Sequence, residues 1–203
     1  MVQLTIDTLA AEARWDTSRI LAIPGRCRGD ALGRWGENLA RRFGGEALTK
    51  VRTRVGPPHD ALPAVLTAKD WVPVHAQLVV TEAIVDELLG GDMRALYPLL
   101  VEDTRAGLGR IQLALVRTLG AGRVLARAAA GIRDVYERGT ATAQVERRRV
   151  RVELRGTPLF GNPTWRLLQL FATRTLLELA GTPGSAVGED LGADAFATIA
   201  TWS

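Results

Sequence analysis

The segment from Val145 to Gly156, VERRRVRVELRG, constrains the fold most strongly because its charged and apolar residues alternate. One set of alternate positions holds Arg147, Arg149, Arg151, Glu153 and Arg155, and the other holds Arg148, Val150, Val152 and Leu154. Successive side chains of a β-strand point to opposite faces, so this period of two predicts a half-buried strand. We therefore expect Arg147, Arg149 and Arg151 to face solvent, and Val150, Val152 and Leu154 to face a core.

The same arginines raise the question of nucleic-acid binding. Surfaces that bind single strands usually add aromatic side chains on which bases stack, and this stretch has none. The preceding run, residues 139–145, is rich in small and β-tolerant residues and could form the neighbouring strand. A solvated outer strand face is therefore favoured over a nucleic-acid surface, while an acidic protein partner stays open.

Composition predicts a globular protein. The chain has 203 residues, of which 47% are hydrophobic and 24% charged. Lys50 and Lys69 are the only lysines among 26 basic residues, so the isoelectric point of about 10.0 reflects arginine usage more than a large net charge. A GC-rich genome explains that usage most simply. No uncharged apolar run is long enough to span a membrane, and the N-terminus lacks the basic start of a secretory signal. With Cys27 as the one cysteine, we expect a cytoplasmic protein without a disulfide.

The chain before the arginine-rich strand has the 3.6-residue period of amphipathic helices. Helices are predicted over residues 31–43, 46–54, 71–89 and 98–119, with a further helix after Gly122. Glycine pairs or a Gly-Pro-Pro loop follow the first three. Pro98 suits the first turn of the fourth, where Gly107 and Gly109 would permit close packing or a bend.

Asn162 and Pro163 begin the most clearly delimited helix. Asn162 is a good N-cap, Pro163 suits the first helical position, and Gly181 lies just past the expected end. The tail from Asp194 to Trp202 alternates again and predicts a final strand.

These elements predict the α+β class, with a helical N-terminal half packed on a small antiparallel sheet and a C-terminal hairpin–helix–strand unit. Within one domain of residues 1–203, we assign 1–22 to an N-terminal extension. Residues 23–137 form the mainly helical part, and 138–203 the hairpin, helix and strand.

One known family shares this order of features. The relevant residues are Arg28-Gly29-Asp30-Ala31-Leu32, Trp35, Leu39, Phe43-Gly44, Val51-Arg52-Thr53-Arg54, and Trp71-Val72-Pro73 before a long helix. This pattern resembles the opening of heme–nitric-oxide-binding-like domains. The closing strand pair, helix and strand ending in Trp also resemble an uncharacterised myxobacterial paralogous family related to that superfamily. The resemblance covers most of residues 20–202.

The resemblance implies a ligand pocket between helices and sheet. In heme-containing members it also implies an axial histidine just before the β half, followed by a Tyr-x-Ser-x-Arg motif on the sheet. The corresponding stretch here, LARAAAGIRDVYERG, has no histidine, and the motif occurs nowhere in the chain. We therefore expect no histidine-ligated heme and no other cofactor.

Several side chains at helix starts and strand junctions are candidates for lining such a pocket. They are Trp71, His75, Arg133, Tyr136, Phe160 and Trp165. The same aromatics could simply fill the interface between layers, and His75 could be a helix histidine satisfied by a neighbour.

Nothing in the sequence indicates a catalytic or metal-binding site. With one cysteine and two histidines, a zinc site of the ordinary Cys/His type is hard to build, and Cys27 is expected to be a small buried hydrophobe. No Gly-x-Ser-x-Gly motif exists, and Gly120-Ala-Gly122-Arg123 lacks the Lys-Ser/Thr of a phosphate loop. The acid pairs Asp86-Glu87 and Glu102-Asp103 are expected to be solvated or paired with arginine.

Two functions remain. The first is a non-enzymatic sensory or adaptor domain that contacts a protein partner and self-associates as a homodimer, because a sheet edge must be covered and residues 71–89 and 163–180 carry extra apolar positions. The alternative is a heme-free domain of the same superfamily that binds a small apolar ligand. Neither nucleic-acid binding nor a membrane span is expected.

Overall fold

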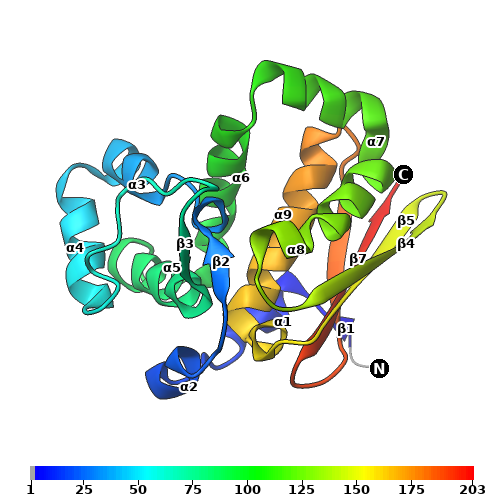
Figure 1. Cartoon of the computed structure of the whole chain (residues 1–203). Helices are drawn as coiled ribbons and strands as arrows, with labels where there is room; N and C mark the ends of the chain where they lie inside the picture. The colour runs from blue at the N-terminus through cyan, green and yellow to red at the C-terminus, as the bar shows by residue number, and fades with distance from the viewer. Residues whose placement is uncertain (1–2) are drawn as a thin grey trace.

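The structure is a computed structural model that describes residues 3–203. An antiparallel sheet lies on one side of the molecule and α3, α4 and α5 on the other, with α9 in between (Figure 1). The helices are α1 (Ile6–Ala11), α2 (Thr17–Leu21), α3 (Trp35–Phe43), α4 (Glu46–Val55), α5 (Val74–Leu88), α6 (Leu96–Gly107), α7 (Arg110–Ala130), α8 (Ile132–Val135) and α9 (Pro163–Leu179). The strands are β1 (Gln3–Leu4), β2 (Arg26–Arg28), β3 (Trp71–Pro73), β4 (Thr140–Glu146), β5 (Arg149–Arg155), β6 (Gly184–Asp190) and β7 (Ala195–Trp202). The short 3-10 helices are η1 (Gly29–Ala31), η2 (Met93–Ala95) and η3 (Pro158–Gly161).

The main sheet has five antiparallel strands in the order β1-β6-β7-β5-β4, and β2 pairs with β3 in a separate small sheet. β4 and β5 form the predicted hairpin, with Val150 opposite Ala200 of β7 on the other side. Helices α7 and α9 cover the face that carries Val150, where Leu125 and Leu177 are buried beside it. The α+β prediction is confirmed.

The arginine-rich strand differs in part from the prediction. Val150 and Leu154 are 1% and 2% exposed, as expected, but Val152 is only half-buried. The strand begins at Arg149, because Arg147 and Arg148 form the exposed hairpin turn. Arg148 therefore does not lie on the apolar row.

Arg151 is not a freely solvated side chain. Its guanidinium lies 2.6 Å from Glu153 of the same strand and 2.9 Å from Glu189 of β6, and Glu153 also pairs with Arg155. The arginine row is thus partly neutralised across the sheet, which further weakens the nucleic-acid alternative.

Two predicted helices have different limits in the structure. The segment 71–89 is a helix only from Val74, because Pro73 restricts Val72 to extended backbone and Trp71–Pro73 pairs with β2. The segment 98–119 belongs to two helices, since Leu108 is extended between α6 and α7. Gly120 (φ 75°) then kinks α7 where the prediction placed an end.

The N-terminal segment and the strands β2, β3 and β6 were not recognised from the sequence. Residues 3–22, assigned to an extension, form β1, α1 and α2, and Leu9 and Ile20 are 2% and 3% exposed. β6 reads GSAVGED, whose small and polar residues hide its strand character.

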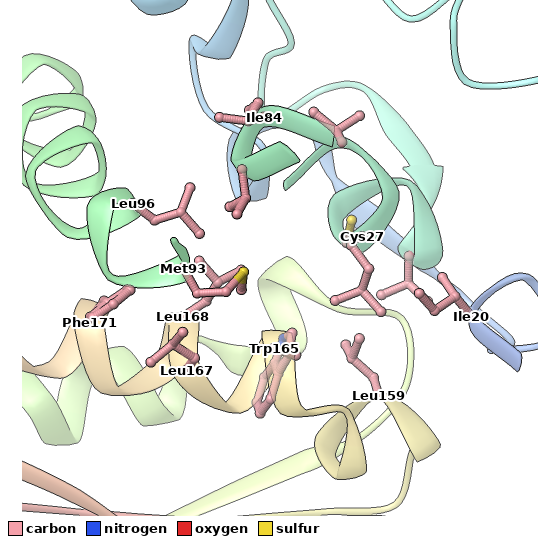
Figure 2. Packing of buried hydrophobic residues seen from close by; sticks show 14 of the residues in the cluster. Ile20, Cys27, Ile84, Met93, Leu96, Leu159, Trp165, Leu167, Leu168 and Phe171 are labelled. Atoms are coloured by element: carbon pink, nitrogen blue, oxygen red, sulfur yellow. The ribbon is translucent and has the colours of Figure 1, made fainter. Parts of the chain in front are cut away.

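Helices α5 and α9 form the centre of the core (Figure 2). Trp165, Leu167 and Leu170 of α9 and Leu78 of α5 are completely buried. As predicted, the Asn162 side chain accepts a hydrogen bond from the Trp165 N–H, Pro163 occupies the first turn, and Gly181 has a φ of 74°. The apolar excess of these two helices, which motivated the prediction of self-association, is therefore used within the chain. Across residues 3–203, each helix is too short or too polar to cross a membrane.

Candidate functional site

A cavity of about 250 Å³ lies between α3, α5, α6 and α9, with Val135 and Tyr136 closing one side. Most of its lining is apolar: Ala31, Leu32, Trp35, Leu39, Val80, Ile84, Leu96, Leu99, Leu100, Val135, Leu168 and Ala172. Figure 2 shows three of them, Ile84, Leu96 and Leu168, approaching the same part of the core from α5, α6 and α9. The volume falls between the roughly 150 Å³ of an engineered cavity that binds benzene and the roughly 300–1,000 Å³ of drug-sized pockets.

The lining residues divide into an interior and a mouth. Trp35, Leu39, Val80 and Leu96 are buried. The half-buried lining residues are Ala31 and Leu32, Leu99, Leu100 and Asp103 of α6, Val135 of α8, and Gln169 and Ala172 of α9. Because six of these eight residues belong to α6, α8 and α9, we place the mouth between these three helices.

A hydrogen-bond network crosses the interior wall. Trp165 donates its Nε1–H to the Tyr136 hydroxyl at 3.2 Å, and that hydroxyl donates to Oε1 of Gln77 at 3.1 Å. Gln77 in turn donates Nε2–H to the carbonyl of Ala31 at 3.1 Å. Burial raises the pKa of Tyr136 above its usual range, so its hydroxyl keeps its proton. The network fixes the aromatic side of the cavity.

Asp103 carries the charge at the mouth. Its Oδ1 accepts the backbone N–H of Arg34 at 3.2 Å and the Asn38 Nδ2–H at 2.5 Å, which ties α6 to the start of α3. A Cβ at Gly33 would overlap the Asp103 carboxylate, so this close approach requires glycine there. Burial raises the pKa of Asp103 despite the nearby Arg34 and Arg41.

Trp35 supplies a polar atom without a partner. The residue is 6% exposed and lines the cavity, yet its Nε1–H donates to nothing among residues 3–203. Buried donors almost always have a partner, so this one is notable.

The six predicted pocket residues take different places. Tyr136 lines the cavity, and Trp165 donates a hydrogen bond to the Tyr136 hydroxyl. Phe160 packs on Trp165, with the two ring centroids 4.6 Å apart. Trp71 is 40% exposed on β3, and Arg133 is exposed on α8. His75 lies at the start of α5, away from the cavity lining.

The two histidines contact each other. His59 Nε2 and His75 Nδ1 are 2.9 Å apart, and burial lowers the pKa of both side chains. Among residues 3–203, no group of three or more His, Cys, Asp or Glu side chains could hold a metal ion. This pair fits the expectation of a helix histidine satisfied by a neighbour.

Comparison with solved structures decides the fold family. The Fe(II) unliganded H-NOX protein from K. algicida matches at 14% identity and a TM-score of 0.54, over 87% of this chain and 96% of that one. The chain has the H-NOX fold.

Two further H-NOX structures agree. An oxygen-binding H-NOX domain related to soluble guanylate cyclases matches at 10% identity and a TM-score of 0.54, over 87% of this chain and 95% of that one. A mutant of T. tengcongensis H-NOX matches at 10% identity and a TM-score of 0.54, over 87% and 97%. No family model and no curated protein matches the sequence. The resemblance to heme–nitric-oxide-binding-like domains is thus confirmed at the level of the fold.

The residues of this H-NOX fold do not suit a heme. The stretch that would carry the axial histidine forms the end of α7, α8 and the approach to β4, and it contains none. The cavity lining has no histidine, cysteine or methionine within the described residues. Tyr136 is the remaining ligand type, but its hydroxyl is already engaged in hydrogen bonds with Gln77 and Trp165. The described lining therefore offers no free side chain as an axial ligand for a heme.

Cys27 is also expected to be unreactive. It is completely buried, as predicted, and burial raises the pKa of its thiol to about 12. A thiol with so high a pKa is a poor nucleophile and a poor metal ligand at neutral pH.

The polar residues of the cavity were missed by the sequence reasoning. The prediction for the acid pairs is correct for Glu102, which pairs with Arg42, and for Asp86, which pairs with Arg14. Asp103, however, is half-buried and accepts a hydrogen bond from Asn38. The residues around Asp103 in the sequence give no signal of this role, because only the packing of α6 against α3 brings the two side chains together.

Proposed function

We propose that this chain is a non-enzymatic sensory domain that binds a small, mostly apolar molecule in the cavity between α3, α5, α6 and α9, without heme. The observation that carries the proposal is the cavity itself, which lies inside an H-NOX fold and lacks an axial heme ligand. The H-NOX structures that it resembles include an oxygen-binding domain, which supports a sensory role for the fold.

We expect toluene to bind the wild-type protein at one site. The cavity volume of about 250 Å³ is larger than that of a cavity that binds benzene and smaller than that of most drug-sized pockets, so a single substituted ring should fit. Ala172→Phe should abolish binding, since Ala172 is half-buried at the mouth and a ring there fills the entrance. Isothermal titration calorimetry measures both. Ala40→Phe is the matched control, because it adds the same ring on the exposed side of α3 and should leave binding unchanged.

The same sample tests the absence of heme. We expect the purified protein to show no Soret absorbance and no saturable change when hemin is added. Heme that co-purifies in proportion to protein, or toluene binding that survives in Ala172→Phe, would contradict the proposal.

A second function, self-association, is supported by a different surface. β4 is an edge strand of the main sheet, and Glu146 is the one charged residue among its seven. Edge strands without lysine, proline or a bulge are sites at which another chain can add. Near the end of β4, Val145 is 53% exposed and lies beside Gly122 of α7. Earlier in α7, Ile111, Leu115 and Leu119 form an exposed apolar stripe.

We infer that two copies pair along β4, and light scattering at micromolar concentration should give a mass above the 21.9 kDa of one chain. Thr142→Lys with Gln144→Lys should return the monomer, because these exposed positions would bring like charges together across the two-fold axis. The control, Ala11→Lys with Ala13→Lys, adds the same charge at exposed positions near α1 and should leave the dimer intact. A wild-type mass that stays at one chain on concentration would refute the inference.

A further inference from the structure

We propose that α7 docks on an anionic membrane surface, with its exposed aliphatic side chains in the headgroup layer and its arginines on lipid phosphates. This is a peripheral contact and not a membrane span. The ligand cavity takes no part in it, because no residue of α7 lines that cavity.

The first half of α7 carries an exposed apolar stripe. Ile111, Leu115 and Leu119 are 78%, 53% and 44% exposed, and their spacing of four residues places them on one side of the helix. The buried residues of α7 all follow the kink at Gly120, so the stripe belongs to the part of the helix that is least covered by the protein. Figure 1 shows α7 at the edge of the molecule, beside the β4–β5 hairpin. Exposed apolar patches of this kind mark surfaces that bind a protein or a membrane.

The same segment is basic throughout. Between Asp103 and Asp134 the chain has six arginines and no acidic residue. All six are exposed, and within residues 3–203 none of them pairs with a carboxylate; they are Arg105, Arg110, Arg117, Arg123, Arg127 and Arg133. Among the other arginines of the described chain, eleven form ion pairs. The guanidinium groups around the stripe are therefore available to external anions.

This charge argues against two other occupants of the stripe. A two-fold contact between two copies would bring the arginines of one α7 against those of the other, without an acidic residue in the segment to offset them. The phosphates of a nucleic acid would suit the arginines, but they provide little apolar surface for three aliphatic side chains. The occupant must supply negative charge and an apolar layer together.

A membrane supplies both and also suits the spacing of the arginines. They follow one another at intervals of five, seven, six, four and six residues, so they form no regular row that carboxylates on a partner helix could match. Lipid phosphates cover the whole surface and need no such register. Helices that lie in the membrane interface combine an aliphatic side with basic residues, and anionic lipids attract each of those residues.

Flotation of the full chain with lipid vesicles measures this contact. We expect binding to phosphatidylcholine vesicles that contain about 30% phosphatidylglycerol, and little binding to phosphatidylcholine alone or in about 1 M salt. Arg110→Gln with Arg117→Gln should lower the partition coefficient by about fivefold for each arginine removed. Ile111→Ser with Leu115→Ser should lower it by about tenfold or more, because the apolar area that enters the headgroup layer is lost.

Matched controls place the same changes on other elements. Arg19→Gln with Arg54→Gln removes the same charge from exposed positions on α2 and α4. Leu21→Ser with Phe43→Ser removes two side chains that are 43% and 37% exposed at the ends of α2 and α3. Both control pairs should bind the anionic vesicles as the wild type does.

Failure of the wild type to bind the anionic vesicles, or equal losses in the α7 variants and their controls, would overturn the proposal. Two further results would overturn it in favour of another occupant. The first is a DNA duplex that binds the wild type and is lost in Arg110→Gln with Arg117→Gln, while the vesicles do not bind. The second is a lower mass by light scattering, without vesicles, for Ile111→Ser with Leu115→Ser, which would assign the stripe to a second copy.

Discussion

Replacing Arg166 with methionine is expected to lower the free energy of unfolding by about 3 kcal/mol or more, the usual cost of removing one partner from a buried ionic network. The Arg166 side chain is buried in α9 and donates to the carbonyl oxygens of Phe160 at 2.8 Å, Gly192 at 2.9 Å and Ala195 at 3.2 Å. It also donates to Asp190 at 2.9 Å. Methionine has similar length but no donor, so all four acceptors lose this partner.

The measurement is thermal unfolding, in which such a loss should lower the Tm by roughly 6–12 °C for a chain of this size. Arg174→Met is the matched control on the exposed face of α9, and we expect it to cost less than about 1 kcal/mol, as exposed ion pairs do. Asp190→Asn should also cost less than Arg166→Met, because Asp190 is about half exposed and the amide keeps an acceptor. Equal losses for Arg166→Met and Arg174→Met would show that the turn between β6 and β7 does not depend on Arg166.

Local signals in the sequence predicted the elements that carry their own delimiters. Asn162, Pro163 and Gly181 delimit α9 because each satisfies a local requirement of a helix end. The β4–β5 hairpin was predicted because alternation is a local property. The strands β6 and β1 were not predicted. The residues of β6 are mostly small or polar, and β1 has only two residues, so each becomes a strand only through pairing, β6 with β7 and β1 with β6.

The cavity was only partly predictable. Tyr136 and Trp165 were chosen for their aromatic character near helix and strand junctions, and the structure joins them by a hydrogen bond. Asn38 and Asp103 are 65 positions apart, and only the packing of α3 against α6 brings them together. Sequence periodicity reports which side of a helix is buried, but it does not report which partner that side meets.

Val150→Asp is expected to prevent cooperative folding, because a carboxylate at a 1% exposed position would enter the cluster formed with Ala121, Leu125, Leu177, Ala180 and Ala200. Circular dichroism and thermal unfolding should show loss of the native transition. Val150→Ala keeps the prediction measurable if the aspartate variant cannot be purified. It should cost roughly 2 kcal/mol through lost burial and the cavity left behind.

The arginines of the same segment should respond in a graded way. Arg147→Gln lies in the exposed turn and should change stability by less than about 0.5 kcal/mol. Arg151→Gln should cost more than Arg147→Gln, because the Arg151 and Glu189 side chains are only 18% and 13% exposed and Glu153 also loses one of its two arginine partners. Both substitutions should lower the stability of the protein far less than Val150→Asp does. If all three substitutions had equal effects, the alternation in this segment would not separate a buried row from a charged one, and the register of β5 against β7 would be wrong.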